Sequence, residues 1–148
     1  MFNFKKVTAV AAAFVLSLSA VAFVGCGATK SGSKFVGTWH LSQIVQNGQA
    51  RTPAEFVDYL SQNSGLPISA ELQSSLVFRD DGTGNYYYSF LDNYETAFTY
   101  TESGNTATAI MSMVDGEEPS ETVFTYDNEK GVISISDPTT GDGSIFTK

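Results

Sequence analysis

The sequence predicts an all-β protein, folded as an antiparallel up-and-down barrel of about eight strands. The first indication is composition, because aromatic and β-branched residues dominate after residue 76 while Leu, Lys and Glu are sparse there. The second is the spacing of turn residues such as Asp81-Gly82 and Asp115-Gly116, which divide this region into short segments. Short strands joined mostly by hairpins are typical of a small closed barrel.

The first strand is predicted over residues 35–46, where apolar and polar residues alternate. His40 falls on the polar face and is expected to point to solvent. Gln43 and Ile44 break the alternation, so we expect the strand to bend or end near them, before a turn at Asn47-Gly48. The apolar face consists of Gly37, Trp39, Leu41 and Val45.

A helical insertion of about two short helices is predicted between the first two strands, beside or over the open end of the barrel. Thr52 can cap the first helix, Pro53 suits the first helical position, and Glu55 lies three residues after the cap. Gly65 is expected to end that helix. A second short helix is predicted over residues 69–75, with its first serine as the cap.

The remaining strands are expected to follow one another through turns, and the whole of residues 35–148 is expected to form one domain. We place these strands near residues 76–80, 84–91, 95–102, 106–114, 121–127, 131–136 and 143–147.

The N-terminal segment has the layout of a secretory signal. Lys5 and Lys6 precede a stretch, residues 7–24, that is almost wholly apolar or small. This stretch ends in Phe23-Val24-Gly25-Cys26, which resembles the lipobox of bacterial lipoproteins. The resemblance implies cleavage before Cys26, a lipid on its thiol, and acylation of the new amino terminus, for example with palmitate. An uncleaved anchor helix and an ordinary signal peptide are the alternatives.

These features predict three parts of the chain: a signal peptide over residues 1–25, a flexible tether over 26–34, and the barrel over 35–148. The tether, which starts at Cys26, is polar and too poor in apolar residues to pack. The expected location is extracytoplasmic, on the cell membrane or in the outer envelope, with the membrane as a partner through the lipid.

A short motif at the start of the first strand points to a family. Gly37-Thr38-Trp39 resembles the G-x-W motif of the lipocalin superfamily. The segment from Leu76 to Thr83 and the two closing strands are also similar to bacterial lipocalin-like lipoproteins. The resemblance implies that Trp39 packs across the closed end of the barrel, under a basic side chain from late in the chain. Lys148 is the only late candidate near a strand end.

Composition and motifs argue against several function classes. The formal net charge of −8 repels phosphate backbones, so no nucleic-acid partner is expected. His40 is the only histidine, and neither a nucleotide-binding nor a hydrolase motif is present. Asp137 and Asp142 flank a turn, but their spacing does not match an EF-hand loop. We therefore expect no enzymatic activity, no metal site and no cofactor.

The aromatic faces of the later strands are the candidate binding site. If they point inward, phenol hydroxyls and methionines line a cavity for a small apolar or amphipathic ligand. The alternative is a filled core, which would make the protein a non-enzymatic envelope module that contacts an unknown protein partner. The candidate ligand-binding residues are Tyr86, Tyr88, Phe90, Phe98, Tyr100, Met111, Met113 and Tyr126.

The lipobox-like segment gives a first prediction. Cys26→Ser removes the thiol that would carry the lipid, so it should abolish acylation and partitioning into detergent. Mass spectrometry of the wild-type protein checks the premise, and an unmodified thiol at Cys26 would contradict it.

Overall fold

The computed structural model describes residues 32–148, which form one antiparallel sheet closed into a barrel. The predicted signal peptide, Cys26 and most of the predicted tether lie outside the described residues. The strands are β1 (Gly37–Gln46), β2 (Gln49–Arg51), β3 (Gln73–Phe78), β4 (Thr83–Ser89), β5 (Asn93–Ser103), β6 (Thr106–Met111), β7 (Ser120–Asp127), β8 (Val132–Ser136) and β9 (Gly143–Thr147). Within residues 32–148 the only helix is α1 (Pro53–Ser64), which lies between β2 and β3.

Sequential neighbours pair from β3 to β9, and β1 pairs with both β3 and β9. Eight strands therefore close the barrel, which confirms the predicted fold class. β2 is an additional short strand that pairs with the last residues of β1 through the Asn47-Gly48 turn. Both turn residues have positive φ, 52° and 74°, as a tight hairpin of this kind requires.

Two parts of the sequence prediction differ from the structure between β1 and β3. The strand β2 was not predicted, so α1 follows the second strand along the chain and not the first. The predicted second helix over residues 69–75 is wrong, because Gln73–Ser75 opens β3 and residues 67–72 have no regular structure. Ser74 pairs with Tyr88 and Ser75 with Tyr87, and these ladder hydrogen bonds outweigh a local serine cap.

The bend predicted in the first strand is a β-bulge. The register between β1 and β9 shifts between Leu41 and Gln43, and the Ser42 hydroxyl donates to the carbonyl oxygen of Ile145 at 3.0 Å. The extra residue reverses the alternation beyond it. Ile44, and not Val45 as predicted, therefore shares the inner face with Leu41.

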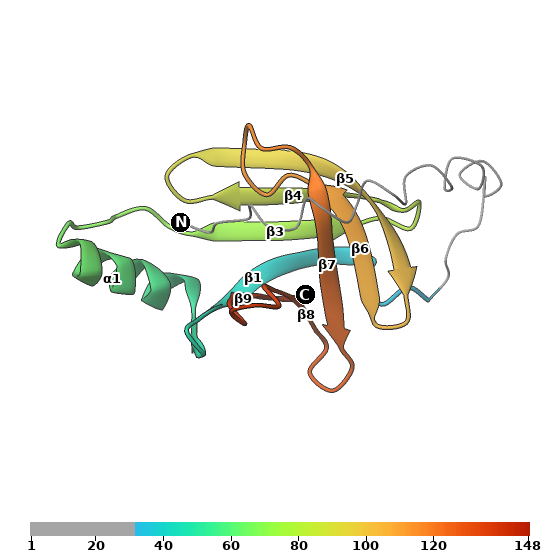
Figure 1. Ribbon diagram of the computed structural model, residues 1–148, viewed down its shortest axis with the longest axis horizontal. Coiled ribbons are helices and arrows are strands. Elements are labelled where there is room, and N and C mark those ends of the chain that lie inside the picture. The colour runs from blue at the N-terminus through green and yellow to red at the C-terminus, as the bar shows by residue number, and fades with distance from the viewer. Residues whose placement is uncertain (1–31) are drawn as a thin grey trace.

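Helix α1 begins and ends as the sequence predicts. The Thr52 hydroxyl accepts a hydrogen bond from the Glu55 amide at 3.3 Å, and the Glu55 carboxylate accepts one from the Thr52 amide at 2.8 Å. Gly65 ends the helix in the left-handed conformation, with φ of 68°. The helix lies beyond one end of the barrel strands, on the left of Figure 1, and contacts β1 and β2. We call this end, where β1 ends and β3 begins, the open end.

Trp39 fills the opposite, closed end. Its side chain is 1% exposed, and its indole N–H donates to the carbonyl oxygen of Phe35 at 2.7 Å. The Lys148 ammonium lies 4.7 Å from the indole ring centroid and donates to the carbonyl oxygen of Val36 at 3.0 Å. Gly37 has φ of 133°, and a Cβ there would lie 3.1 Å from Lys148 Cε. The glycine, tryptophan and lysine thus form one packed unit.

The chain enters the barrel at this closed end. The Ser33 hydroxyl donates to the Glu102 carboxylate at 2.5 Å. The Lys34 ammonium donates to the side-chain oxygens of Asn105 at 2.6 Å and of Asn128 at 2.8 Å. These contacts join the residues just before the barrel to the β5–β6 and β7–β8 turns.

The closed half of the interior is filled by aromatic rings around Phe78. Its ring centroid lies 5.2 Å from Phe98, 4.9 Å from Tyr100 and 5.4 Å from Phe124, all in edge-to-face geometry. Gly84 makes this packing fit, because a Cβ there would lie 2.3 Å from the Phe98 ring. This half of the barrel is therefore a solid core.

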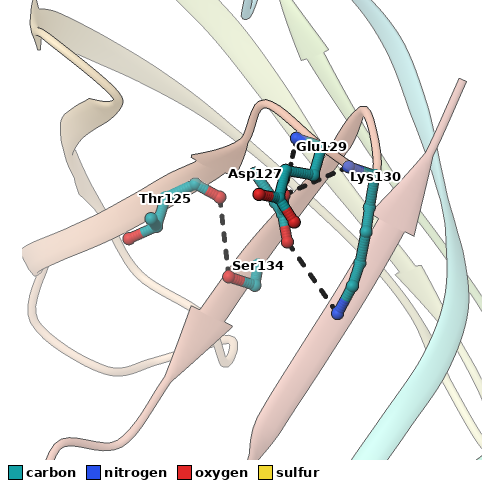
Figure 2. Close-up of polar contacts among 5 residues, drawn as sticks. All are labelled: Thr125, Asp127, Glu129, Lys130 and Ser134. Carbon is teal, nitrogen blue, oxygen red and sulfur yellow. Dashed lines mark hydrogen bonds and ion pairs between the residues drawn. The ribbon is translucent and has the colours of Figure 1, made fainter.

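The β7–β8 hairpin at the same end is held by a carboxylate. Figure 2 shows Asp127 Oδ1 accepting hydrogen bonds from the backbone amides of Glu129 at 2.9 Å and Lys130 at 3.1 Å. The Lys130 ammonium lies 3.9 Å from Asp127 Oδ2. These hydrogen bonds lower the pKa of the Asp127 carboxyl, and the one from the Lys130 amide has the larger effect.

The packing of Trp39 gives a second prediction. Trp39→Ala should lower the free energy of unfolding by about 3–5 kcal/mol, since it removes a buried ring and leaves a cavity. His40→Ala is the matched control on the exposed face of the same strand, and it should change the value by less than about 0.5 kcal/mol. Denaturant melts measure both, and equal losses would contradict this assignment of faces.

Candidate functional site

A pocket of about 170 Å³ occupies the open half of the barrel interior. Its walls come from β1, β3, β4, β8 and β9, and Phe56 of α1 and Leu72 before β3 complete its rim. The bulge in β1 places Leu41 and Ile44 together in this wall. The lining residues are Leu41, Ile44, Phe56, Leu72, Ser74, Tyr86, Tyr88, Met113, Ile135, Ser144 and Phe146.

The pocket is mainly apolar, and no side chain in its lining is an acid, a lysine or an arginine. Its polar groups are the hydroxyls of two serines and two tyrosines. Ser74 is 6% exposed, and its hydroxyl oxygen is buried without a hydrogen-bond partner. A buried hydroxyl of this kind costs free energy until it finds a partner.

The two tyrosines at the pocket are held in their neutral form. Burial raises the pKa of Tyr86 to about 12, against a smaller lowering by the nearby Ser74 hydroxyl. The two hydroxyls are neighbours, but their geometry does not make a hydrogen bond. Burial also raises the pKa of Tyr88. The hydroxyl of the adjacent Tyr94 is already engaged, because it donates to the Ser112 carbonyl oxygen at 3.0 Å.

The structure brings three of the eight candidate ligand-binding residues together at this pocket, namely Tyr86, Tyr88 and Met113. Met113 reaches it from the loop after β6, because β6 ends at Met111 and not at residue 114 as predicted. The Ser112 hydroxyl donates to the Val114 carbonyl oxygen at 2.6 Å within this loop.

The other five candidates lie elsewhere. Phe98, Tyr100 and Met111 belong to the buried core, and the Tyr100 hydroxyl donates to the Arg79 carbonyl oxygen at 2.5 Å. Tyr126 packs edge-on against Trp39 at the closed end, with 6.1 Å between ring centroids. Phe90, predicted within a strand, lies in the turn between β4 and β5, where its amide donates to the Asp92 carbonyl oxygen.

Sequence reasoning did not select the other lining residues as ligand contacts. Alternation in the last two strands was a usable signal for Ile135 and Phe146. Ile44 was hidden by the bulge, and Ser74 by its assignment to a helix. The contribution of Phe56 depends on where α1 docks, which local patterns do not encode.

A second, larger hollow of about 420 Å³ lies on the outside, between α1 and β2. Its lining includes Arg51, Glu55 and Asp58, and it is more open to solvent than the interior pocket. The Arg51 guanidinium lies 4.2 Å from the ring centroid of Tyr59 there. Because it is charged and wide open, the hollow resembles ordinary surface more than a binding site.

The residues considered for metal chemistry are engaged with backbone. Asp137 Oδ1 accepts from the amides of Thr139 at 2.6 Å and Thr140 at 3.3 Å, and Asp142 Oδ1 accepts from the Asn47 amide at 2.8 Å. Within residues 32–148, no three acidic, histidine or cysteine side chains gather as metal ligands. In the same range, no helix combines the length and apolarity needed to span a membrane.

Comparison with known proteins agrees with the barrel and its closed-end motif. The sequence model of the lipocalin-like domain family matches residues 35–130. The chain belongs to this family. The matched lipocalin-like region runs from the closed end through β7 and contains most of the pocket wall, while β8 and β9 complete it. No curated protein and no solved structure matches the chain.

The buried phenol in this lipocalin-like pocket gives a third prediction. The unfolded chain releases the Tyr86 proton near the usual pKa of about 10, whereas the folded protein holds it to about 12. The folded state binds more protons in between, so the free energy of unfolding should fall as pH rises from about 10 to 12. Tyr86→Phe should reduce this slope in denaturant melts. An unchanged slope would contradict the burial of this hydroxyl.

Proposed function

We propose that this protein binds a small apolar or amphipathic molecule in the pocket at the open end, while a lipid on Cys26 anchors it outside the cytoplasm. The lipocalin-like barrel suggests a small-ligand-binding domain. The observation that carries the proposal is the apolar pocket in the open half of the barrel, with a few hydroxyls among apolar side chains.

The volume sets the size of the ligand. Sites for drug-sized molecules usually measure about 300–1,000 Å³, whereas this pocket measures about 170 Å³. An apolar cavity of about 150 Å³ is enough to hold benzene. The pocket therefore suits one ring or the end of a chain, and any longer part of the ligand would lie at the rim near Phe56 and Leu72.

The filled closed half limits the depth of binding. Phe78, Phe98 and Phe124 pack together below the pocket, so a haem or a whole fatty acid cannot enter without displacing them. This solid half matches the interior expected for an interaction module. The open half matches the interior expected for a binding protein, and it is the part that supports our proposal.

The anchor is supported by the order of charge, apolar stretch and small residue before Cys26. Acyl chains contribute about 0.8 kcal/mol for each buried methylene, so two or three would hold the protein firmly. Ser33 and Lys34 meet the barrel at its closed end. In the proposed arrangement the tether therefore attaches the barrel to the membrane by its closed end. The mouth of the pocket lies at the other end.

The fourth prediction tests binding by filling the pocket. A compound that binds only the folded protein should raise its stability by about 2.7 kcal/mol at a hundred times the dissociation constant. A thermal-shift screen of small aromatics, short-chain alcohols, fatty acids and isoprenoids should yield hits among the ring-sized compounds. Met113→Trp should weaken such a hit, because the added ring occupies the pocket.

Ile110→Trp is the matched control, since it adds the same ring on the exposed outer face of β6. It should leave binding unchanged. If no ring-sized compound stabilises the wild-type protein, the binding proposal is wrong, and the non-enzymatic interaction module takes its place.

A further inference from the structure

We infer that the pocket selects a neutral molecule with one hydrogen-bonding group, which Ser74 and Tyr86 engage, and that it rejects carboxylates and amines of the same size. This inference rests on the proposed binding function and specifies the chemistry of the ligand. It is carried by the placement of two hydroxyls and by the absence of charged side chains from the pocket lining.

Ser74 is the first element of the argument. The alternation of β3 turns Ser74, Leu76 and Phe78 to the inside of the barrel. The two larger residues extend the apolar core, but Ser74 puts a hydroxyl at the pocket wall, with its oxygen buried and unpartnered. A polar ligand atom within reach of this hydroxyl would satisfy it and recover the cost of its burial.

Tyr86 supplies a second hydroxyl beside the first. It lies on β4, the strand paired with β3, and its side chain is 5% exposed. Serine and tyrosine hydroxyls both donate and accept, so the pair can engage a ligand hydroxyl or carbonyl oxygen. The rest of the lining is mostly apolar, which leaves room for one polar group on an otherwise apolar ligand.

The lack of charged side chains in the pocket lining disfavours ionised ligands. The pocket lining contains no acid, lysine or arginine to balance a ligand charge, and burying an unpaired charge is far more costly than burying a hydroxyl. Tyr86 stays neutral at physiological pH, so it offers no anion to an ammonium group. The chain as a whole carries a formal charge of −8, which adds long-range repulsion against carboxylates.

The fifth prediction uses four probes of nearly equal size: toluene, benzyl alcohol, benzoate and benzylamine at pH 7. The sample is residues 26–148 with Cys26→Ser, which contains the whole closed barrel and needs no detergent. Chemical-shift titrations should show benzyl alcohol binding about two- to tenfold more tightly than toluene, the range for one net hydrogen bond. Benzoate and benzylamine should bind more weakly than either.

Ser74→Ala should remove the preference for benzyl alcohol over toluene while keeping or improving toluene binding. Tyr86→Phe should reduce the same preference while keeping the aromatic ring in the pocket wall. Ser75→Ala is the matched control, because the next residue of β3 faces the outside of the barrel, and it should leave the preference intact.

Equal binding of benzoate or benzylamine and benzyl alcohol would overturn the inference, as would an unchanged preference in Ser74→Ala. If toluene binds and benzyl alcohol binds no better, the inference fails while the proposed function stands. If neither neutral probe binds to the wild-type sequence, the proposed function fails, and the inference fails with it.

Discussion

The pairing of β1 with β9 is the constraint on which the rest of this structure depends. It closes the sheet, so every barrel strand acquires an inner and an outer face and no long edge is left unpaired. The bulge between Leu41 and Gln43 lies within this ladder and turns the last part of β1, so that Ile44 faces the pocket. The same strand carries Trp39 at the closed end. The strand β1 thus closes the barrel, fills its closed end with Trp39 and forms part of the pocket wall.

Closure leaves an interior that is solid in one half and hollow in the other, and the difference follows from the side chains. At the closed end, Phe78 interdigitates with the rings of Phe98, Tyr100 and Phe124, and Gly84 leaves room for the Phe98 ring. At the open end, medium-sized aliphatic residues and two serines face a wall of tyrosines, which leaves about 170 Å³. The aromatic side chains from three strands fill the barrel interior more completely than short side chains do. The solid half stabilises the barrel, and the hollow half is where the proposed ligand would bind.

The hydroxyls at the hollow end connect stability with function. A buried, unpartnered Ser74 hydroxyl is a cost that a fully apolar wall would avoid, and Leu or Val at this position would suit a pure packing role. Residues that break local packing rules are often found at functional sites. In this pocket the departure lies next to a buried tyrosine, away from charges, and this arrangement underlies the proposed choice of a neutral ligand.

The sequence by itself determined the class of fold, most of the strands, the caps of α1 and the family, because alternation, turn residues and capping boxes are local signals. It also identified Trp39 and Lys148, whose contact the family motif implied. Only the tertiary structure decided which inward-facing residues line the pocket. Tyr86 and Tyr100 have the same alternation pattern, yet one lies at the open end and the other in the solid half. The place of Ser74 in a strand, and so in the pocket wall, follows only from its pairing with Tyr88. The pocket is lined by side chains from strands that are far apart in sequence. How deep each of these side chains lies along the barrel depends on the register of strand pairing and on the closure of the sheet.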